Sequence, residues 1–207
     1  MADLVFYTNP MSRGRIVRWM LEETGADYDT VVLDYAASMK APDYLAVNPM
    51  GKVPAIVHRG AVVTECAAIC AYLADTFPAA GLAPPPDARA DYYRWMFFAA
   101  GPLEQAITNR SMRFDPSPEQ GRMAGYGSYD LAVDTLEKAV SAHDYVAGDR
   151  FTAADVYVGA QVGWGLRFGT LPRRDAFSAY WRRLEGRDAW TRASARDDAL
   201  MPAQPVA

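Results

Sequence analysis

The stretch that decides the fold is residues 4–33, LVFYTNPMSRGRIVRWMLEETGADYDTVVL. It begins and ends with short apolar runs, 4–7 and 31–33, of the kind expected of strands that are buried on both faces. Between the runs lies a stretch of about a dozen residues whose apolar side chains recur at helical spacing: Ile16, Trp19 and Met20. The order strand, helix, strand predicts a βαβ unit.

A second pair of short apolar runs, 55–58 and 61–64, is separated only by Arg59 and Gly60. A two-residue connection of this kind predicts a β-hairpin. Apolar residues then recur at helical spacing until Pro78, which ends the helix. Together with the βαβ unit, these segments predict the order β-α-β-(α)-β-β-α, that is, an α/β domain with a mixed sheet.

A stiff, Pro-rich linker is predicted at residues 78–87, so we expect an α/β domain at 1–77 and an all-α domain at 88–207. Beyond the linker the apolar period is helical throughout. One predicted stripe consists of Tyr93, Met96, Phe97, Ala100, Leu103 and Ile107. Thr152 and Asp155 have the spacing of a capping box, which predicts the start of another helix.

The composition is that of a globular protein: 207 residues, 51% hydrophobic and 22% charged, with a net charge of −4. This acidic balance argues against a nucleic-acid-binding protein. No apolar run reaches the roughly 18 residues of a membrane span and no signal peptide precedes the first strand, so we expect a cytoplasmic protein. Cys66 and Cys70 lie four apart, a helical spacing poorly placed for a disulfide, and there is no other Cys, so we expect two reduced, buried thiols. Since few further ligands are nearby, we expect no metal site.

The first candidate for chemistry is the turn from Tyr7 to Arg13. It places a tyrosine at the carboxyl end of the first strand and Ser12 at the start of the first helix. Ligands of open α/β sheets dock at this edge, and a helix start carries partial positive charge that suits a thiolate or another anion. The plain alternatives are that Ser12 only caps the helix and that Tyr7 is a core residue of the strand.

Two further segments offer groups to a peptide-like ligand. In residues 48–54, Pro54 must begin a strand or lie at its edge, which leaves the backbone of Val53 available for strand-like pairing; the alternative is an ordinary turn. Glu65 and Cys66 stand at the start of the next helix, where backbone N–H groups suit a carboxylate and the Glu65 side chain can accept from an ammonium. The carboxylate and ammonium of one α-amino-acid group would fit these two positions. The alternative is that Glu65 only caps the helix.

The sequence resembles the cytosolic glutathione S-transferase family, and its bacterial type in particular, in three segments: YTNPMSRGRIVRWMLEE at 7–23, NPMGKVPA at 48–55 and TECAAICAYLAD at 64–75. Their order and spacing and the helical second half agree with the family, and FTAAD at 151–155 is similar to its helical-domain signature. The resemblance implies a thioredoxin-like domain that binds glutathione, a helical domain that contributes an electrophile pocket, and a homodimer.

The resemblance also implies roles for individual residues. Val53, beside a cis Pro54, would pair with the cysteinyl backbone of glutathione, and Glu65 and Cys66 would hold its γ-glutamyl end. Cys66 departs from the family, where Ser is usual, and a thiol is a weaker hydrogen-bond donor than a hydroxyl. The basic residues implied at the glutathione site are Arg13 beside Ser12, and Lys40 or Lys52 near the glycyl carboxylate.

Activation of the glutathione thiol is expected at the start of the first helix. Enzymes of this fold use a Tyr, a Ser or a Cys there, and residues 1–65 contain no Cys. Ser12 matches the serine-type position and is favoured, because its hydroxyl and the helix end can act on one sulfur; Tyr7 is the alternative. The electrophile pocket is expected at the domain interface, with walls from the helical domain: Tyr93, Trp95, Met96, Phe97, Arg110 and Trp164.

The expected function is that of a glutathione S-transferase, in which the thiolate of glutathione attacks an electrophilic, hydrophobic small molecule, as in detoxification. Two alternatives stay open. One is a glutathione-dependent isomerase or peroxidase. The other is a non-catalytic module of the same fold that binds glutathione or a protein partner.

Overall fold

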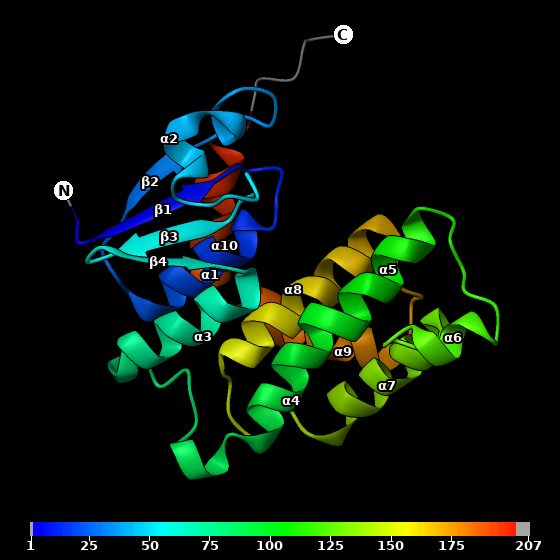
Figure 1. The fold of residues 1–207 in the computed structure, drawn as a ribbon. Helices are drawn as coiled ribbons and strands as arrows, with labels where there is room; N and C mark the ends of the chain where they lie inside the picture. Colours follow the sequence, from blue (N-terminus) through cyan, green and yellow to red (C-terminus); the bar gives the residue numbers. More distant parts are fainter. Residues whose placement is uncertain (1, 202–207) are drawn as a thin grey trace, which may run out of the picture. The chain divides into compact units, whose positions relative to one another are not determined.

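The computed structural model describes residues 2–201 (Figure 1). The chain divides into two compact units. The first consists of Met1–Ala80 together with Arg187–Ala207, and the second is Gly81–Gly186. The expected fold class is confirmed, because a thioredoxin-like unit with a mixed sheet is followed by a helical unit.

Within the described residues, the first unit is built on a four-stranded sheet with the order β2-β1-β3-β4. Its strands are Leu4–Thr8 (β1), Asp29–Val32 (β2), Ala55–His58 (β3) and Ala61–Thr64 (β4). β1 runs parallel to β2 and antiparallel to β3, and β3 and β4 form the predicted hairpin. In the hairpin turn, Arg59 and Gly60 have positive φ angles of 51° and 83°, as a tight two-residue connection requires.

The prediction that the run 31–33 is buried on both faces is wrong. It falls on β2, an edge strand, whose residues Asp29, Thr30 and Val32 are exposed, and only Leu33 just beyond the strand is buried. A short apolar run has the same composition in a central and in an edge strand, so its place in the sheet is decided by pairing with distant residues.

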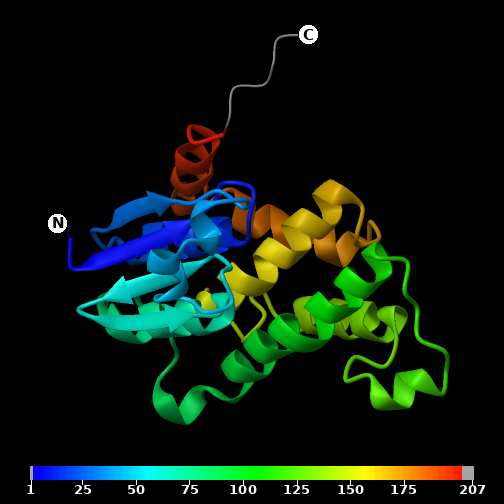
Figure 2. The same ribbon diagram turned by 45° about the horizontal axis from the view of Figure 1, so that its top comes forward.

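Helices cover both faces of the sheet (Figures 1 and 2). Phe6 of β1 lies under α1, where the guanidinium of Arg18 is 5.1 Å from the centre of its ring. The next residue, Tyr7, points to the other face and packs against Tyr44 of α2, with ring centres 5.4 Å apart. The helices on the sheet, apart from short 3₁₀ turns, are α1 (Gly14–Thr24), α2 (Pro42–Leu45) and α3 (Cys66–Thr76).

The last helix, α10 (Asp188–Asp198), packs along α1 and belongs to the first unit. The rings of Trp19 and Trp190 meet edge to face at 5.0 Å in this contact. The helical unit therefore ends at Gly186, whereas the sequence placed all of 88–207 in one helical domain. Periodicity predicts that a segment is helical, but it does not predict which core the helix joins.

The second unit is helical, and a capping box starts its most buried helix. The side chains of Thr152 and Asp155 satisfy the free backbone N–H groups there, and Asp155 also accepts from Val146 N and the Tyr180 hydroxyl, at 2.7 and 2.8 Å. This confirms the predicted capping box. The helices of the unit are α4 (Ala90–Phe98), α5 (Glu104–Ser111), α6 (Gln120–Met123), α7 (Tyr129–Ala142), α8 (Ala153–Phe168) and α9 (Asp175–Glu185).

The predicted stripe along α4 and α5 is partly wrong. Tyr93 and Phe97 are 40% and 64% exposed, and the buried stripe consists of Tyr92, Trp95, Met96, Ala99, Leu103 and Ala106. Large apolar residues stand side by side at 92–93 and 97–98, so the sequence does not decide which member of each pair faces the core. A π-helical turn, Ala99–Leu103, also changes the period, because Pro102 has no N–H for a regular helical bond.

None of the helices in residues 2–201 is both long and apolar enough to cross a membrane.

Candidate functional site

The strand register brings the three candidate segments to one end of the sheet. Tyr7 pairs with Ala55, and Ala55 pairs with Thr64, so the end of β1, the start of β3 and the end of β4 lie side by side. The segments attached to these three strand ends form what we call the assembled edge: residues 9–13, 48–54 and 65–66.

Ser12 lies in the turn of the assembled edge, before the first residue of α1. Its hydroxyl accepts from the backbone N–H of Gly14 at 2.9 Å and donates to the backbone carbonyl of Asn9 at 2.7 Å. The capping bond expected of Ser12 is therefore present. The oxygen is held at the helix start, where the partial positive charge of the helix dipole favours an anion.

Asn9 and Gly14, which the sequence analysis did not single out, build this turn. The side chain of Asn9 donates to Leu33 O at 2.7 Å and accepts from Met11 N at 2.9 Å. An added Cβ on Gly14 would lie 2.0 Å from the hydroxyl of Thr8, so only glycine fits beside the end of β1. Asn before Pro at a strand end is a turn signal that could have identified Asn9, but the Gly14 contact has no local signal.

Tyr7 occupies the face of the sheet that carries α2. It packs, partly buried, into a cluster that contains Tyr44, and the hydroxyl of Tyr44 in turn donates to Lys52 O at 2.5 Å. Burial raises the pKa of Tyr44 to about 12, and the nearby Tyr7 adds to this effect. Tyr7 thus makes the packing contacts of its plain alternative, and its role as a donor stays a prediction.

The loop 48–54 is fixed by polar contacts to its own backbone. Asn48 donates to Lys52 O at 2.8 Å, and Lys40 Nζ donates to Gly51 O at 2.7 Å. The Val53–Pro54 peptide bond is cis. Within residues 2–201 no hydrogen bond is made to the backbone N–H or C=O of Val53, so both groups remain available to an extended ligand.

The start of α3 completes the assembled edge. Glu65 is exposed and has φ 66° and ψ 114°, a conformation that L residues rarely adopt and that often marks functional sites. Cys66, the first residue of α3, is buried, and its Sγ lies 3.7 Å from Arg13 O. This contact brings the start of α3 beside the start of α1.

Three basic residues were expected at the glutathione site, of which Arg13 and Lys52 belong to the assembled edge and Lys40 lies outside it. Lys40 reaches the loop through its bond to Gly51, whereas Arg13 and Lys52 have exposed side chains. Both cysteines, Cys66 and Cys70, are buried, and neither forms a disulfide bond. Within the described residues there is no cluster of three or more His, Cys, Asp or Glu side chains that could hold a metal ion.

The residues expected to wall the electrophile pocket belong to the second unit and differ in exposure. Met96 and Trp95 are buried in its core, whereas Tyr93 and Phe97 are exposed on α4 and Trp164 is half-buried on α8.

Arg110 lies on α5, beyond the π-helical turn that follows α4. It pairs with Asp115 at 3.0 Å and lines a cavity of about 530 Å³ together with Tyr129 and Arg174. The six expected residues lie on α4, α5 and α8 of the second unit.

The fold and the assembled edge together define a class: a thioredoxin-like unit with polar recognition groups at one sheet end, joined to a helical unit. Comparison with known proteins agrees with this class. The family model described as "Glutathione S-transferase, N-terminal domain" matches residues 2–75. A sphingomonad glutathione S-transferase, solved in complex with glutathione, has 30% sequence identity and a TM-score of 0.77, covering 94% of this chain and 98% of its own.

Two curated proteins are similar over most of their length. The chain is 31% identical over 194 residues to glutathione S-transferase GST-4.5 of Xanthomonas campestris pv. campestris, which covers 86% of this chain and 91% of that protein. It is 31% identical over 150 residues to glutathione S-transferase GstA of Escherichia coli O157:H7, covering 70% and 73%. The chain belongs to the glutathione S-transferase family.

Proposed function

We propose that this chain is a glutathione transferase that binds glutathione along the assembled edge and activates its thiol at the start of α1. The observation that carries the proposal is the strand register, which gathers three segments suited to a peptide-like anion at one end of the sheet. The second substrate is an electrophilic, hydrophobic small molecule. Structures of relatives with glutathione bound support glutathione as the co-substrate.

Each part of glutathione has a chemical counterpart at the assembled edge. The backbone of Val53, beside Pro54, pairs with the cysteinyl residue in the manner of an added strand. The Glu65 carboxylate accepts from the γ-glutamyl ammonium, while the N–H groups at Cys66 hold the adjacent carboxylate. The glycyl carboxylate is left to Lys40 or Lys52.

Ser12 is the proposed donor to the glutathione sulfur, with Arg13 adding positive charge beside it. Gly14 N–H holds the Ser12 oxygen in place, so rotation of the hydroxyl away from Asn9 O would direct its proton to a thiolate. A charge-assisted hydrogen bond contributes roughly 1.5–3 kcal/mol, which lowers a thiol pKa by about one to two units from about 8.5. Tyr7 is the less suitable donor because it packs against Tyr44.

A non-catalytic glutathione-binding module is the second candidate. The observation that favours it is the bond from the Ser12 hydroxyl to Asn9 O, which engages the proton that catalysis needs. If that bond persists in the complex, glutathione stays bound as a neutral thiol and does not react.

The second unit is the proposed source of electrophile contacts, chiefly through the exposed rings of Tyr93 and Phe97. Arg110 and Trp164 remain candidates, and the buried Met96 would have to move to take part. We also propose a homodimer, on the basis of family membership. Sedimentation at micromolar concentration should give twice the chain mass of 22.8 kDa, and a value of one chain mass would contradict the dimer.

The direct test titrates the ultraviolet absorbance of bound thiolate against pH. The wild-type protein should be retained on immobilised glutathione and should conjugate glutathione to members of an electrophile panel. It should also lower the pKa of the bound glutathione thiol. Ser12→Ala should raise that pKa and reduce turnover while glutathione affinity changes little. Tyr7→Phe is the matched control, and it should leave the titration unchanged.

Each result separates the alternatives. A shift of the thiolate titration in Tyr7→Phe alone would identify Tyr7 as the donor to the sulfur. Retention without turnover in wild type would favour the binding module. No retention at all would contradict the proposed glutathione site.

A further inference from the structure

The turn that carries Ser12 has one backbone carbonyl held by Arg15 of α1, which is itself paired with the C-terminal helix. Arg15 Nε donates to Pro10 O at 2.6 Å. Pro10 directly follows Asn9, whose carbonyl accepts from the Ser12 hydroxyl. The bond to Pro10 O therefore restrains the peptide that directly follows the acceptor of the Ser12 hydroxyl.

The same guanidinium also contacts α10. Arg15 Nη2 lies 2.7 Å from Asp198 Oδ1, 183 residues away in the sequence. The Arg15 side chain is only 18% exposed, and its planar group uses two different nitrogens for its two partners. A lysine has one point charge and cannot bridge both groups in this geometry.

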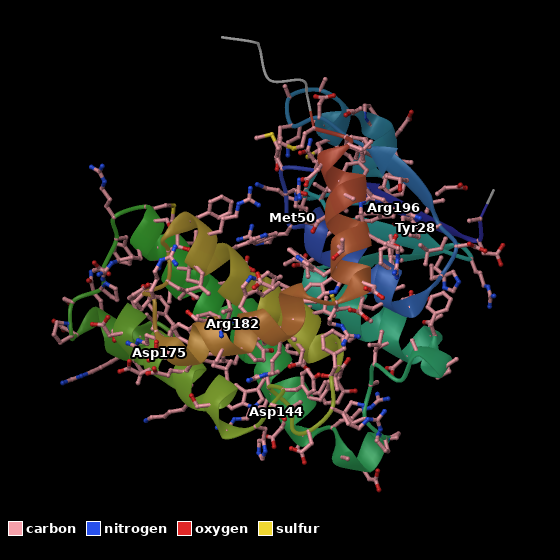
Figure 3. The ribbon with its side chains drawn as sticks, turned by 180° about the vertical axis from the view of Figure 1, so that it is seen from behind. Tyr28, Met50, Asp144, Asp175, Arg182 and Arg196 are labelled. Atoms are coloured by element: carbon pink, nitrogen blue, oxygen red, sulfur yellow. The ribbon has the colours of Figure 1, made fainter. Side chains whose placement is uncertain are left out.

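Asp198 is held in place because α10 is fastened to α1 along its length. Arg187 binds Glu23 through two bonds of 2.6 and 2.8 Å, and Arg18 binds Asp197 at 2.7 Å. Figure 3 shows Arg196 of α10 beside Tyr28, which it meets at 3.1 Å. α10 is thus fixed against α1, so that Asp198 can orient the Arg15 guanidinium that binds the turn.

We propose that Arg15 is a positioning residue for thiol activation, and that Asp198 of α10 orients it. The inference rests on the proposed function, since it concerns how Ser12 is placed to act on glutathione. Arg15 does not touch the substrate. Together with Asp198 it fixes the Pro10 carbonyl, so that the Ser12 hydroxyl and the start of α1 keep their relation to the sulfur.

The experiment measures the pKa of glutathione bound to Asp198→Ala and Asp198→Asn. Asp198→Ala removes the acceptor, and we expect the bound thiol pKa to rise by about half a unit to one unit, with kcat about three- to tenfold lower and glutathione affinity nearly unchanged. Asp198→Asn keeps an acceptor oxygen and should restore most of the wild-type titration. Arg15→Lys should behave like Asp198→Ala.

The sign of the change in thiol pKa distinguishes a loss of positioning from the direct effect of removing a charge. Removing a carboxylate near the thiol would by itself lower the thiol pKa, because a negative charge disfavours the thiolate. Loss of positioning would instead raise the pKa of the bound thiol. Arg192→Met is the matched control, since it removes another exposed partner of α1 on α10, at Glu22, away from the turn. It should leave the thiol titration unchanged.

Three results would overturn the inference: no shift in Asp198→Ala, a lowered thiol pKa, or equal shifts in Asp198→Ala and Arg192→Met. Failure of the proposed function looks different, because then wild type itself would show an ordinary thiol pKa near 8.5 for bound glutathione. Asp198 is 66% exposed, so both variants at this position are expected to fold.

Discussion

Replacing Arg18 by methionine tests what the buried ion pair between α1 and α10 contributes to stability. Arg18 Nε lies 2.7 Å from Asp197 Oδ1, and the two side chains are 3% and 1% exposed. Burial raises the pKa of Asp197 even though the guanidinium lies beside it and acts in the opposite direction. In Arg18→Met the carboxyl stays buried and loses that guanidinium, so its pKa rises further.

The expected loss follows from this burial and depends on pH. Breaking one side of a buried pair costs about 3–5 kcal/mol. A carboxyl whose folded-state pKa is above its unfolded value stabilises the fold while it is protonated, and this stabilisation is lost as the pH rises through the folded-state pKa. Arg18→Met should therefore lose about 3–5 kcal/mol near pH 8 and recover part of it toward about pH 5.

Urea unfolding followed by tryptophan fluorescence measures this loss, because two of the chain's five tryptophans, Trp19 and Trp190, meet between α1 and α10. Adding Asp197→Leu to Arg18→Met should recover most of the stability, since a well-packed apolar pair often equals or exceeds a buried ion pair. Arg192→Met should cost less than about 1 kcal/mol at every pH.

The reasoning is refuted if the Arg18→Met loss is the same at all pH values and Asp197→Leu does not reduce it. In that case the contact of Arg18 with the ring of Phe6, at 5.1 Å, would account for the loss instead of the stranded carboxyl.

Two further substitutions probe the assembled edge. Gly14→Ala places a Cβ 2.0 Å from the Thr8 hydroxyl and should cost about 1–3 kcal/mol in thermal unfolding, and Thr8→Ala should recover part of that loss; full wild-type stability in Gly14→Ala alone would contradict the contact. Cys66→Ser supplies a stronger donor where the γ-glutamyl carboxylate is proposed to bind, so calorimetry should show several-fold tighter glutathione binding, and weaker binding would argue that the side chain does not reach the ligand.

Much of the first unit follows from local sequence. The apolar run at 55–58, the two-residue turn at Arg59 and Gly60, and the run at 61–64 specify a hairpin without reference to the rest of the chain. The capping box at Thr152 is local in the same way, because its hydrogen bonds span three residues. Such features are decided by nearest neighbours, and the sequence predicts them correctly.

Features that depend on distant contacts were not predictable in this way. The edge position of β2 depends on which strands pair with β1, and the placement of α10 depends on Trp19 meeting Trp190. On α4, the exposed Tyr93 and the buried Tyr92 are adjacent and chemically alike, so the choice between them is made by tertiary packing. The candidate glutathione-binding segments could be identified from their residue types, but only the strand register brings them to one end of the sheet.

The turn at Ser12 shows why a candidate catalytic serine cannot be evaluated from its own segment. Its hydroxyl is oriented by Asn9 O and Gly14 N, but the two carbonyls that precede it in the turn are held by other side chains: Met11 O accepts from Tyr35 at 3.1 Å, and Pro10 O accepts from Arg15. Tyr35 comes from a different loop, and Arg15 of α1 is itself paired with Asp198 of the last helix of the unit. Since a shift of one peptide changes the direction of the hydroxyl, substitutions far from the sulfur can change thiol activation without changing any group that binds glutathione.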